Sequence, residues 1–477
     1  MSVTTLKNFI NGQPVAAQRG DTIEIISPVD GQVNGVSPKS GATDVEAAYQ
    51  AALAAFADWR KTTPSQRQKA LLAIADGFEA RAQELIDAQC RNTGQLKHFV
   101  ASEEVAVCAD QIRFFAGAAR ILEGRASAEY MSGLNSTIRR EPLGVIAQVA
   151  PWNYPLMMAV WKVIPAIAAG NTVILKPSDT TPESTLLFAE IAAASLPPGV
   201  FNVILGDAAT GEMLVSHPGV SMVSITGSVR AGKAVAAAAA QNLARAHLEL
   251  GGNAPVLVFD DVADIDAAAE HIVTTGCFNA GQDCTAATRV LVADSLHDRF
   301  LAALVEKAQA VRCGKPDDTD ALYGALNNAR QLAHVESFIA NLGAHAKVET
   351  GGKRAGDSGF YFEPTIISGV KQDDAIVQNE VFGPVITVQR FSDEDDALAK
   401  ANGVVYGLAA SVWTSNHGRV QRLSAELNFG TVWINTHIPL TAEMPHGGFK
   451  QSGYGKDLSM YGFEEYTRIK HVMSSVG

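Results

Sequence analysis

Cysteine is scarce in this chain. The 477 residues include five, at positions 90, 108, 277, 284 and 313, and no two have the CxxC spacing of a zinc or redox motif. Such a low density gives no disulfide framework and is typical of a protein that folds in a reducing compartment. We therefore expect a cytoplasmic location and no metal site.

Long apolar runs and basic clusters are also missing. The longest apolar run, residues 155–170, contains Lys162 and two prolines, and the first 13 residues lack the basic and apolar regions of a signal peptide. Lys and Arg number 38 against 50 Asp and Glu, so the formal charge is −12. An acidic chain without a basic cluster disfavours nucleic-acid binding. We expect a small-molecule partner, with neither nucleic acid nor membrane.

A GxGxxG fingerprint is absent after every predicted strand, yet strands and helices alternate from Gly144 onward. Strands are predicted at 144–149, 172–176, 201–204 and 221–226, with helical stretches between them. This alternation is typical of a parallel, doubly wound α/β sheet, which binds ligands at the carboxyl ends of its strands. The length of the chain predicts more than one domain.

Three of these strands run into segments suited to a nucleotide. They are Ala150–Tyr154, Lys176–Asp179 and Gly227–Gly232, which offer aromatic rings, a lysine beside a carboxylate, and a glycine-flanked turn into a helix. A helix N-terminus at such a turn accepts a phosphate. The residues alone leave two readings open, a nucleotide site and an ordinary strand-to-helix turn.

Two further motifs, 35 residues apart, carry reactive side chains. Glu249 lies in LELGG, before an apolar strand predicted at 255–259, and Cys284 lies in FNAGQDC, among small residues. An uncrowded thiol suits a nucleophile and a glutamate beside it suits a general base. Taken singly, each could equally be a packing residue or a solvated strand end.

Together the two motifs resemble the aldehyde dehydrogenase superfamily, and the resemblance extends over essentially the whole chain. It implies the α/β aldehyde dehydrogenase fold, with a Rossmann-like NAD-binding domain, an α/β catalytic domain and a small β oligomerisation arm. The expected boundaries are 1–120 and 143–248 for the NAD-binding domain, 249–444 for the catalytic domain, and 121–142 and 455–477 for the arm.

The resemblance implies oxidation of an aldehyde to a carboxylic acid through a thiohemiacetal and a thioester on Cys284. Glu249 is the implied base for thioester hydrolysis, Asn153 in PWNYP the donor to the oxyanion, and Lys162 part of a proton relay. Without the resemblance, Asn153 could bond its own backbone and Lys162 could be an exposed helix charge.

The implied cofactor is NAD. In the resemblance Lys176 and Asp179 contact the adenosine ribose and Ser228 the pyrophosphate, while the EVFGP motif at 380–384 contacts the nicotinamide side. The family's commoner residue at position 179 is glutamate, and the shorter aspartate leaves NADP as an alternative. The expected cofactor-binding residues are Ala150, Trp152, Lys176, Ser178, Asp179, Gly227, Ser228, Gly232, Leu250, Glu380 and Phe382.

Within the superfamily, GQDC, residues 114–120 and residues 452–473 look most like bacterial aminobutyraldehyde dehydrogenases. Acidic residues favour a cationic substrate, because Asp283 precedes the nucleophile and Glu103 and Asp110 share one face of a helix predicted at 102–122. Aromatic rings add cation–π attraction. The expected substrate residues are Asp110, Tyr154, Trp161, Asp283 and Trp433, and the expected substrate is an ω-aminoaldehyde such as 4-aminobutanal.

Other functions remain open. Betaine aldehyde or a general aliphatic aldehyde could be the substrate. A coenzyme A-acylating variant would generally lack the glutamate at position 249, and a non-catalytic structural protein on the same fold would tolerate loss of Cys284. We also expect a homo-oligomer, a dimer or tetramer, in which segments 127–140 and 458–472 pair across subunits. An ordinary surface hairpin is the alternative for residues 127–140.

Overall fold

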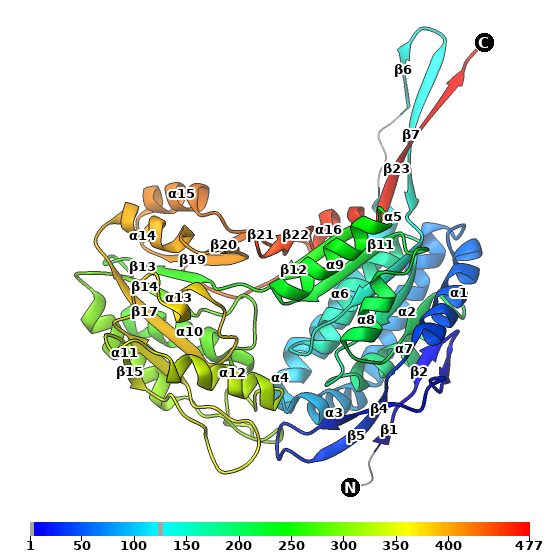
Figure 1. Cartoon of the computed structure of the whole chain (residues 1–477). Helices are drawn as coiled ribbons and strands as arrows, with labels where there is room; N and C mark the ends of the chain where they lie inside the picture. The colour runs from blue at the N-terminus through cyan, green and yellow to red at the C-terminus, as the bar shows by residue number, and fades with distance from the viewer. Residues whose placement is uncertain (1–3, 123–126) are drawn as a thin grey trace.

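The computed structural model describes residues 4–122 and 127–477, which form two lobes and a projecting arm (Figure 1). An eight-stranded sheet lies in the first lobe. Its strands, in spatial order, are β22 (Gly453–Tyr454), β12 (Arg245–Leu250), β11 (Met222–Gly227), β8 (Val145–Val149), β9 (Thr172–Lys176), β10 (Phe201–Val203), β2 (Asn8–Ile10) and β3 (Gln13–Val15).

The five strands from β12 to β10 are parallel to one another. β22 and β2 are antiparallel to their neighbours in this set, and β3 pairs antiparallel with β2. The four strands predicted between 144 and 226 are β8 to β11, each within one residue of its predicted bounds. Their carboxyl ends therefore meet at one edge of the sheet, as the alternation predicts.

Helices cover both faces of this sheet. The most central is α6 (Pro155–Ala168), which is buried at all but one position and begins with Pro155, whose fixed φ suits the first helical turn. The others are α1 (Ala42–Trp59), α2 (Pro64–Ala80), α3 (Ala82–Thr93), α4 (Lys97–Phe99), the π-helical η1 (Val100–Val105), α5 (Ala106–Ile121), α7 (Glu183–Ala193), α8 (Ala208–Val215), α9 (Val229–Gln241) and α16 (Ser459–Glu465). Among the described residues, no helix combines the length and apolarity needed to cross a bilayer.

The second lobe is built on a seven-stranded sheet, parallel except at one edge strand, β15. Its order is β15 (Lys347–Thr350), β16 (Thr365–Ser368), β17 (Val385–Phe391), β14 (Arg289–Ala293), β13 (Pro255–Val258), β19 (Ala409–Trp413) and β20 (Thr431–Ile434). Its helices are α10 (Ile265–Cys277), the 3-10 turn η2 (Phe278–Gly281), α11 (His297–Ala310), α12 (Ala329–Ala340), α13 (Ala375–Gln378), α14 (Glu394–Asn402) and α15 (His417–Glu426).

Two small sheets complete the body. One contains β1 (Thr4–Thr5), β5 (Val33–Pro38) and β4 (Thr22–Ile26), and the other pairs β18 (Tyr406–Gly407) with β21 (Phe449–Lys450). The second of these brings the glycine-rich tail, from residue 446 onward, back toward the centre of the molecule.

The arm is a three-stranded antiparallel sheet that projects from the body and carries the C-terminus (Figure 1). It consists of β6 (Ala128–Met131), β7 (Leu134–Pro142) and β23 (Thr467–Ser475). Residues 123–126, part of the predicted arm, lie outside the described residues. β7 and β23 pair within one chain, so the expectation that these segments pair across subunits is wrong. The tail segment predicted as strand from 458 instead begins with α16, because Phe463 packs into the first core.

Candidate active site

The loop that carries Cys284 is held by three consecutive residues with positive φ. Asn279, Ala280 and Gly281 have φ of 49°, 58° and 66°, a region that is unfavourable for non-glycine residues. Glycine is required at position 281, where a Cβ would overlap the carbonyl oxygen of Gly383. This compact turn after α10 places Cys284, which is partly exposed, between the two lobes' connecting loops.

Asn153 lies against the same loop. Its side-chain Nδ2 donates to the carbonyl oxygen of Gln282 at 3.0 Å, and its own carbonyl accepts from the side chains of Asn279 at 2.9 Å and Gln95 at 3.0 Å. Asn153 therefore bonds across to the nucleophile loop and not to its own backbone. One N–H of its amide remains for another acceptor.

Glu249, near the end of β12, is 1% exposed. One of its oxygens is 3.3 Å from Nε2 of His446, which is also buried. The carboxylate oxygen, a His446 ring nitrogen and the Cys284 sulfur all lie within 4.8 Å of one another. The cluster thus joins the predicted nucleophile, the predicted general base and a histidine that contacts the base.

Burial and negative charge set the ionisation of this cluster. Burial and the carboxylates of Asp283, Glu249 and Glu380 raise the pKa of the Cys284 thiol well above its usual value. The backbone N–H of Cys284 itself opposes this shift. Burial also raises the pKa of Glu249, while His446 and Lys162 act in the opposite direction. The resting site thus favours the protonated thiol of Cys284.

Lys162 is fully buried on α6 and donates from Nζ to Ser224 Oγ at 3.1 Å. Burial lowers its pKa, and the charges of Asp457 and Glu249 partly restore it. The alternative reading of Lys162 as an exposed helix charge is therefore wrong. Its position links Glu249 electrostatically to the buried Asp457.

The residues predicted to bind adenosine and pyrophosphate lie at the carboxyl ends of β9 and β11. Burial lowers the pKa of Lys176 to about 8, and its amine donates to the Pro177 carbonyl at 2.8 Å. Ser178 bonds Asp179 at 3.2 Å. Ser228, exposed beside Gly227, is the N-cap of α9 and accepts from the Ala231 N–H at 3.3 Å. These groups form one polar edge that ends at a helix N-terminus, which fits a dinucleotide.

The residues predicted on the nicotinamide side approach the nucleophile from the second lobe. The rings of Phe382 and Trp152 meet edge-to-face at 5.3 Å. Glu380 accepts from the Gly252 N–H at 2.9 Å, and burial raises its pKa to about 8. Other residues predicted to bind the cofactor contact one another. The Ala150 backbone N–H donates to the Lys176 carbonyl, and a Cβ at Gly232 would overlap Leu250.

Of the five predicted substrate residues, Tyr154 and Asp283 lie together beside Cys284. The Tyr154 hydroxyl donates to Asp283 Oδ2 at 2.7 Å, and Oδ1 accepts from the Thr285 N–H at 2.7 Å and its hydroxyl at 2.6 Å. The Asp283 carboxylate is therefore fixed in orientation. Burial and Asp283 raise the pKa of Tyr154 well above its usual value, so Tyr154 remains a phenol.

The other three lie further out. Trp161 is buried and donates to Gln111 Oε1 at 2.8 Å, and its ring packs 5.3 Å from that of His446. Trp433 donates to the Pro439 carbonyl at 3.0 Å. Asp110 is exposed on α5, so the structure gives no contact between it and the nucleophile loop among the described residues.

Sequence reasoning missed several side chains of this site. His446 is a single histidine between Pro445 and a pair of glycines, and these neighbours are the only local sequence feature that marks it. Phe99 stacks 6.2 Å from Tyr154 and 4.6 Å from Phe278, forming an aromatic cluster behind the nucleophile loop. Glu104, next to the predicted Glu103, turns into the core. Their convergence is long-range, so no local pattern encodes it.

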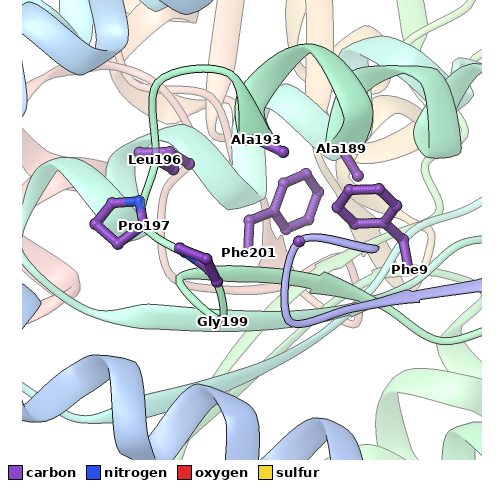
Figure 2. Close-up of a pocket in the computed structure, with 9 residues that line it drawn as sticks. Phe9, Ala189, Ala193, Leu196, Pro197, Gly199 and Phe201 are labelled. Carbon is purple, nitrogen blue, oxygen red and sulfur yellow. The ribbon is translucent and has the colours of Figure 1, made fainter. Parts of the chain in front are cut away.

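A separate hollow of about 60 Å³ lies between β2, α7 and β10 (Figure 2). Its lining is entirely apolar or glycine, with Phe9 and Phe201 facing each other across it. Without a polar or titratable side chain it offers no chemistry, so the candidate site remains the cluster around Cys284.

Comparison with known proteins shows the family of the chain. Residues 15–472 match the model of the aldehyde dehydrogenase family. The betaine aldehyde dehydrogenase of Bacillus subtilis (strain 168) is 39% identical over 473 residues, covering 97% of this chain and 96% of the relative.

Two solved structures are similar over nearly their whole length. Betaine aldehyde dehydrogenase from Staphylococcus aureus in complex with NAD+ has a TM-score of 0.96 at 35% identity, covering 98% of this chain and 94% of that one. A mutant of P. syringae indole-3-acetaldehyde dehydrogenase in complex with NAD+ and IAA has a TM-score of 0.97 at 35% identity, covering 100% and 97%. The chain therefore belongs to the aldehyde dehydrogenase family.

Proposed function

We propose that this aldehyde dehydrogenase oxidises an aldehyde that carries a positively charged group, with NAD as the hydride acceptor and a free carboxylic acid as the product. The carrying observation is the charge around the nucleophile. Burial, and after it the carboxylates of Asp283 and Glu249, raise the pKa of the Cys284 thiol, and Glu380, whose pKa is about 8, adds negative charge only when it is ionised. A cationic substrate offsets that negative charge and favours the thiolate.

The side chains of the site supply each step of the reaction. The Cys284 thiolate would attack the aldehyde carbon, and the Asn153 amide and the Cys284 backbone N–H would donate to the oxygen that becomes negative. Loss of one such donor typically reduces the rate about 10²–10³-fold. NAD bound at this site would supply the acceptor for the hydride that leaves the tetrahedral carbon. Glu249 then takes a proton from the water that hydrolyses the thioester.

The polar edge at β9 and β11 supports NAD as the cofactor. Lys176 and Asp179 would hold the adenosine ribose, Ser228 and the α9 N-terminus the pyrophosphate, and Glu380 and Phe382 the nicotinamide side. The buried Thr226 Oγ, at the end of β11, has no hydrogen-bond partner among the described residues, as expected at an edge built for a further polar group. Both S. aureus and P. syringae structures named above are NAD+ complexes.

Two cationic substrates fit the site. A primary ω-aminoaldehyde such as 4-aminobutanal suits the fixed Asp283 carboxylate, while betaine aldehyde, named for the B. subtilis and S. aureus relatives, suits the aromatic cluster of Phe99, Tyr154 and Phe278. Cation–π attraction of this kind contributes about 0.5–2 kcal/mol. We propose 4-aminobutanal, with betaine aldehyde as the second candidate.

The test is a comparison of kcat/KM for 4-aminobutanal, betaine aldehyde, butanal, succinate semialdehyde and indole-3-acetaldehyde, with NAD and with NADP, and with and without coenzyme A. We expect one of the two cationic aldehydes to exceed butanal by about ten-fold or more, which corresponds to ~1.4 kcal/mol. Product should be the free acid and should not depend on coenzyme A.

Two variants separate charge from shape. Asp283→Asn removes the charge and should reduce the preference for the cationic aldehyde, whereas Tyr154→Phe removes a hydrogen bond to Asp283 but keeps the charge and should preserve it. Equal kcat/KM for butanal and the cationic aldehydes, or a preference for indole-3-acetaldehyde, would contradict the proposed substrate class.

A further inference from the structure

His446 is held rigidly although it lies in a glycine-rich tail. Its backbone pairs with Asp457 in both directions, at 2.9 Å and 2.8 Å, and its ring packs against Trp161 at 5.3 Å with an interplanar angle of 63°. Only 2% of the residue is exposed. The backbone bridge and the indole ring therefore determine which way the imidazole faces.

The imidazole faces the two reacting side chains. Nε2 lies 3.3 Å from Glu249 Oε1, and the Cys284 sulfur belongs to the same cluster of donor atoms. Nδ1 has no hydrogen-bond partner among the described residues, and neither oxygen of Glu249 has a well-aligned hydrogen bond there. The contact between His446 and Glu249 is thus the principal polar contact that each makes.

Several charged groups face this pair. Burial lowers the pKa of His446, but the carboxylates of Glu249 on β12, Asp457 after β22 and Asp283 in the nucleophile loop outweigh it and raise that pKa above its usual value. On the Glu249 side, Lys162 from α6 adds positive charge and Asp457 adds negative charge. The surrounding carboxylates thus favour the imidazolium form of His446, and that cation in turn favours the carboxylate form of Glu249.

We propose that His446 is a positioning residue for the general base, which as an imidazolium keeps Glu249 ionised and directed at the thioester on Cys284. This inference rests on the proposed function. In the step concerned, a water O–H bond breaks and its proton passes to Glu249. The new C–O bond forms, the C–S bond breaks, and Cys284 leaves as a thiolate. A protonated Glu249 could not accept that proton.

The sign of the effect follows from the pair. The imidazolium lowers the pKa of Glu249, so its removal raises that pKa and leaves the base protonated up to a higher pH. In a variant without the cation, the rate of thioester hydrolysis should therefore be reduced mainly at low pH, where Glu249 is protonated. A residue that only packs would reduce the rate equally at every pH.

The experiment uses full-length His446→Gln and His446→Phe, with stopped-flow measurement of NADH formation from pH 5.5 to 9. We expect the first-turnover burst of NADH to remain, while the acid limb of the following steady-state rate moves up by about one pH unit. KM for the aldehyde should change much less than kcat. Thermal unfolding shows whether each variant is folded. If His446→Phe is destabilised, His446→Gln, which keeps a polar side chain, is the variant that tests the proposal.

His437→Gln is the matched control. His437 is also buried and bonds the nucleophile loop, through Nε2 to the Thr285 carbonyl at 2.6 Å, but burial lowers its pKa to about 4, so it is neutral over the whole range. Its replacement should leave the acid limb where it is. An unmoved limb in folded His446→Gln would overturn the proposal, whereas a wild-type protein that shows no NADH burst with any aldehyde would overturn the proposed function instead.

Discussion

At the scale of single residues, exposure and neighbours together distinguish the cysteine that can react. Cys313 is partly exposed like Cys284, but among the described residues only Cys284 lies in the cluster with Glu249 and His446. Cys90, Cys108 and Cys277 are buried, and burial raises the pKa of Cys277 to about 12. Cys284 is partly exposed, within reach of Asn153 and Glu249, although its thiol pKa is also raised. Access and neighbours, more than resting ionisation, thus distinguish the nucleophile, and substrate and cofactor charge must favour its thiolate.

We expect Cys284→Ala to abolish aldehyde-dependent NADH formation and Cys277→Ala to retain it. Cys277 packs in the second core, so its truncation should lower stability by roughly 1 kcal/mol without touching the chemistry. Turnover and thermal unfolding of both variants test this. Residual turnover in Cys284→Ala, or an inactive but folded Cys277→Ala, would refute the assignment.

At the scale of elements, periodicity predicted the strands well because each parallel strand is a short apolar run followed by a turn. The strand predicted at 255–259 is β13 within a residue, and β14, β17 and β19 are apolar runs of the same kind. The helix predicted at 102–122 was less accurate, because a π-helical turn, η1, precedes α5. Helical periodicity has no signal for one such turn.

That turn has a consequence for Glu104. Glu103 is exposed, but Glu104 is fully buried, accepts from the Met157 N–H at 3.2 Å at the start of α6, and also accepts from Gln89. Burial raises its pKa to about 8, against the opposing effect of these hydrogen bonds. The carboxyl group is thereby neutral at lower pH and a buried charge at higher pH.

Glu104 should therefore make stability depend on pH. Its folded pKa lies above its unfolded value, so its contribution is present below about pH 4.3 and is lost as the pH rises through 8. We expect wild-type Tm to fall relative to that of Glu104→Gln between pH 5 and 8, by about 2–4 °C or more. Glu103→Gln is the control and should track the wild type; parallel Tm curves for all three proteins would contradict this.

At the scale of the whole molecule, the convergence of distant segments was the least predictable feature. Glu249, Cys284 and His446 come from β12, the turn after α10 and the C-terminal tail, and only the folded chain brings their reactive atoms together. The spacing of motifs predicted the first two because each sits in a recognisable local setting. His446 depends on the β18–β21 pairing that returns the tail, and local pattern carries no information about that contact.

We propose the domain division given by the two large sheets, with the change between them near residue 250.

The arm is the oligomerisation surface that we propose, in agreement with the expectation from the family resemblance. Several apolar side chains on the arm are exposed in the single chain, and its outer strands leave unpaired edges. The exposed apolar residues there are Tyr130, Met131, Ile469, Val472 and Met473.

Because a projecting sheet with exposed apolar residues is stabilised by covering it, we expect a homo-oligomer in solution, with a mass that is a multiple of 50.4 kDa by light scattering. Ile469→Glu, on β23, places a charge on that surface and should shift the protein toward smaller species. Leu243→Glu is the matched control, since Leu243 is 93% exposed on the body and its charge should leave the mass unchanged. A wild-type protein that is monomeric at 50 kDa, or an Ile469→Glu variant with the wild-type mass, would show that the arm does not hold subunits together.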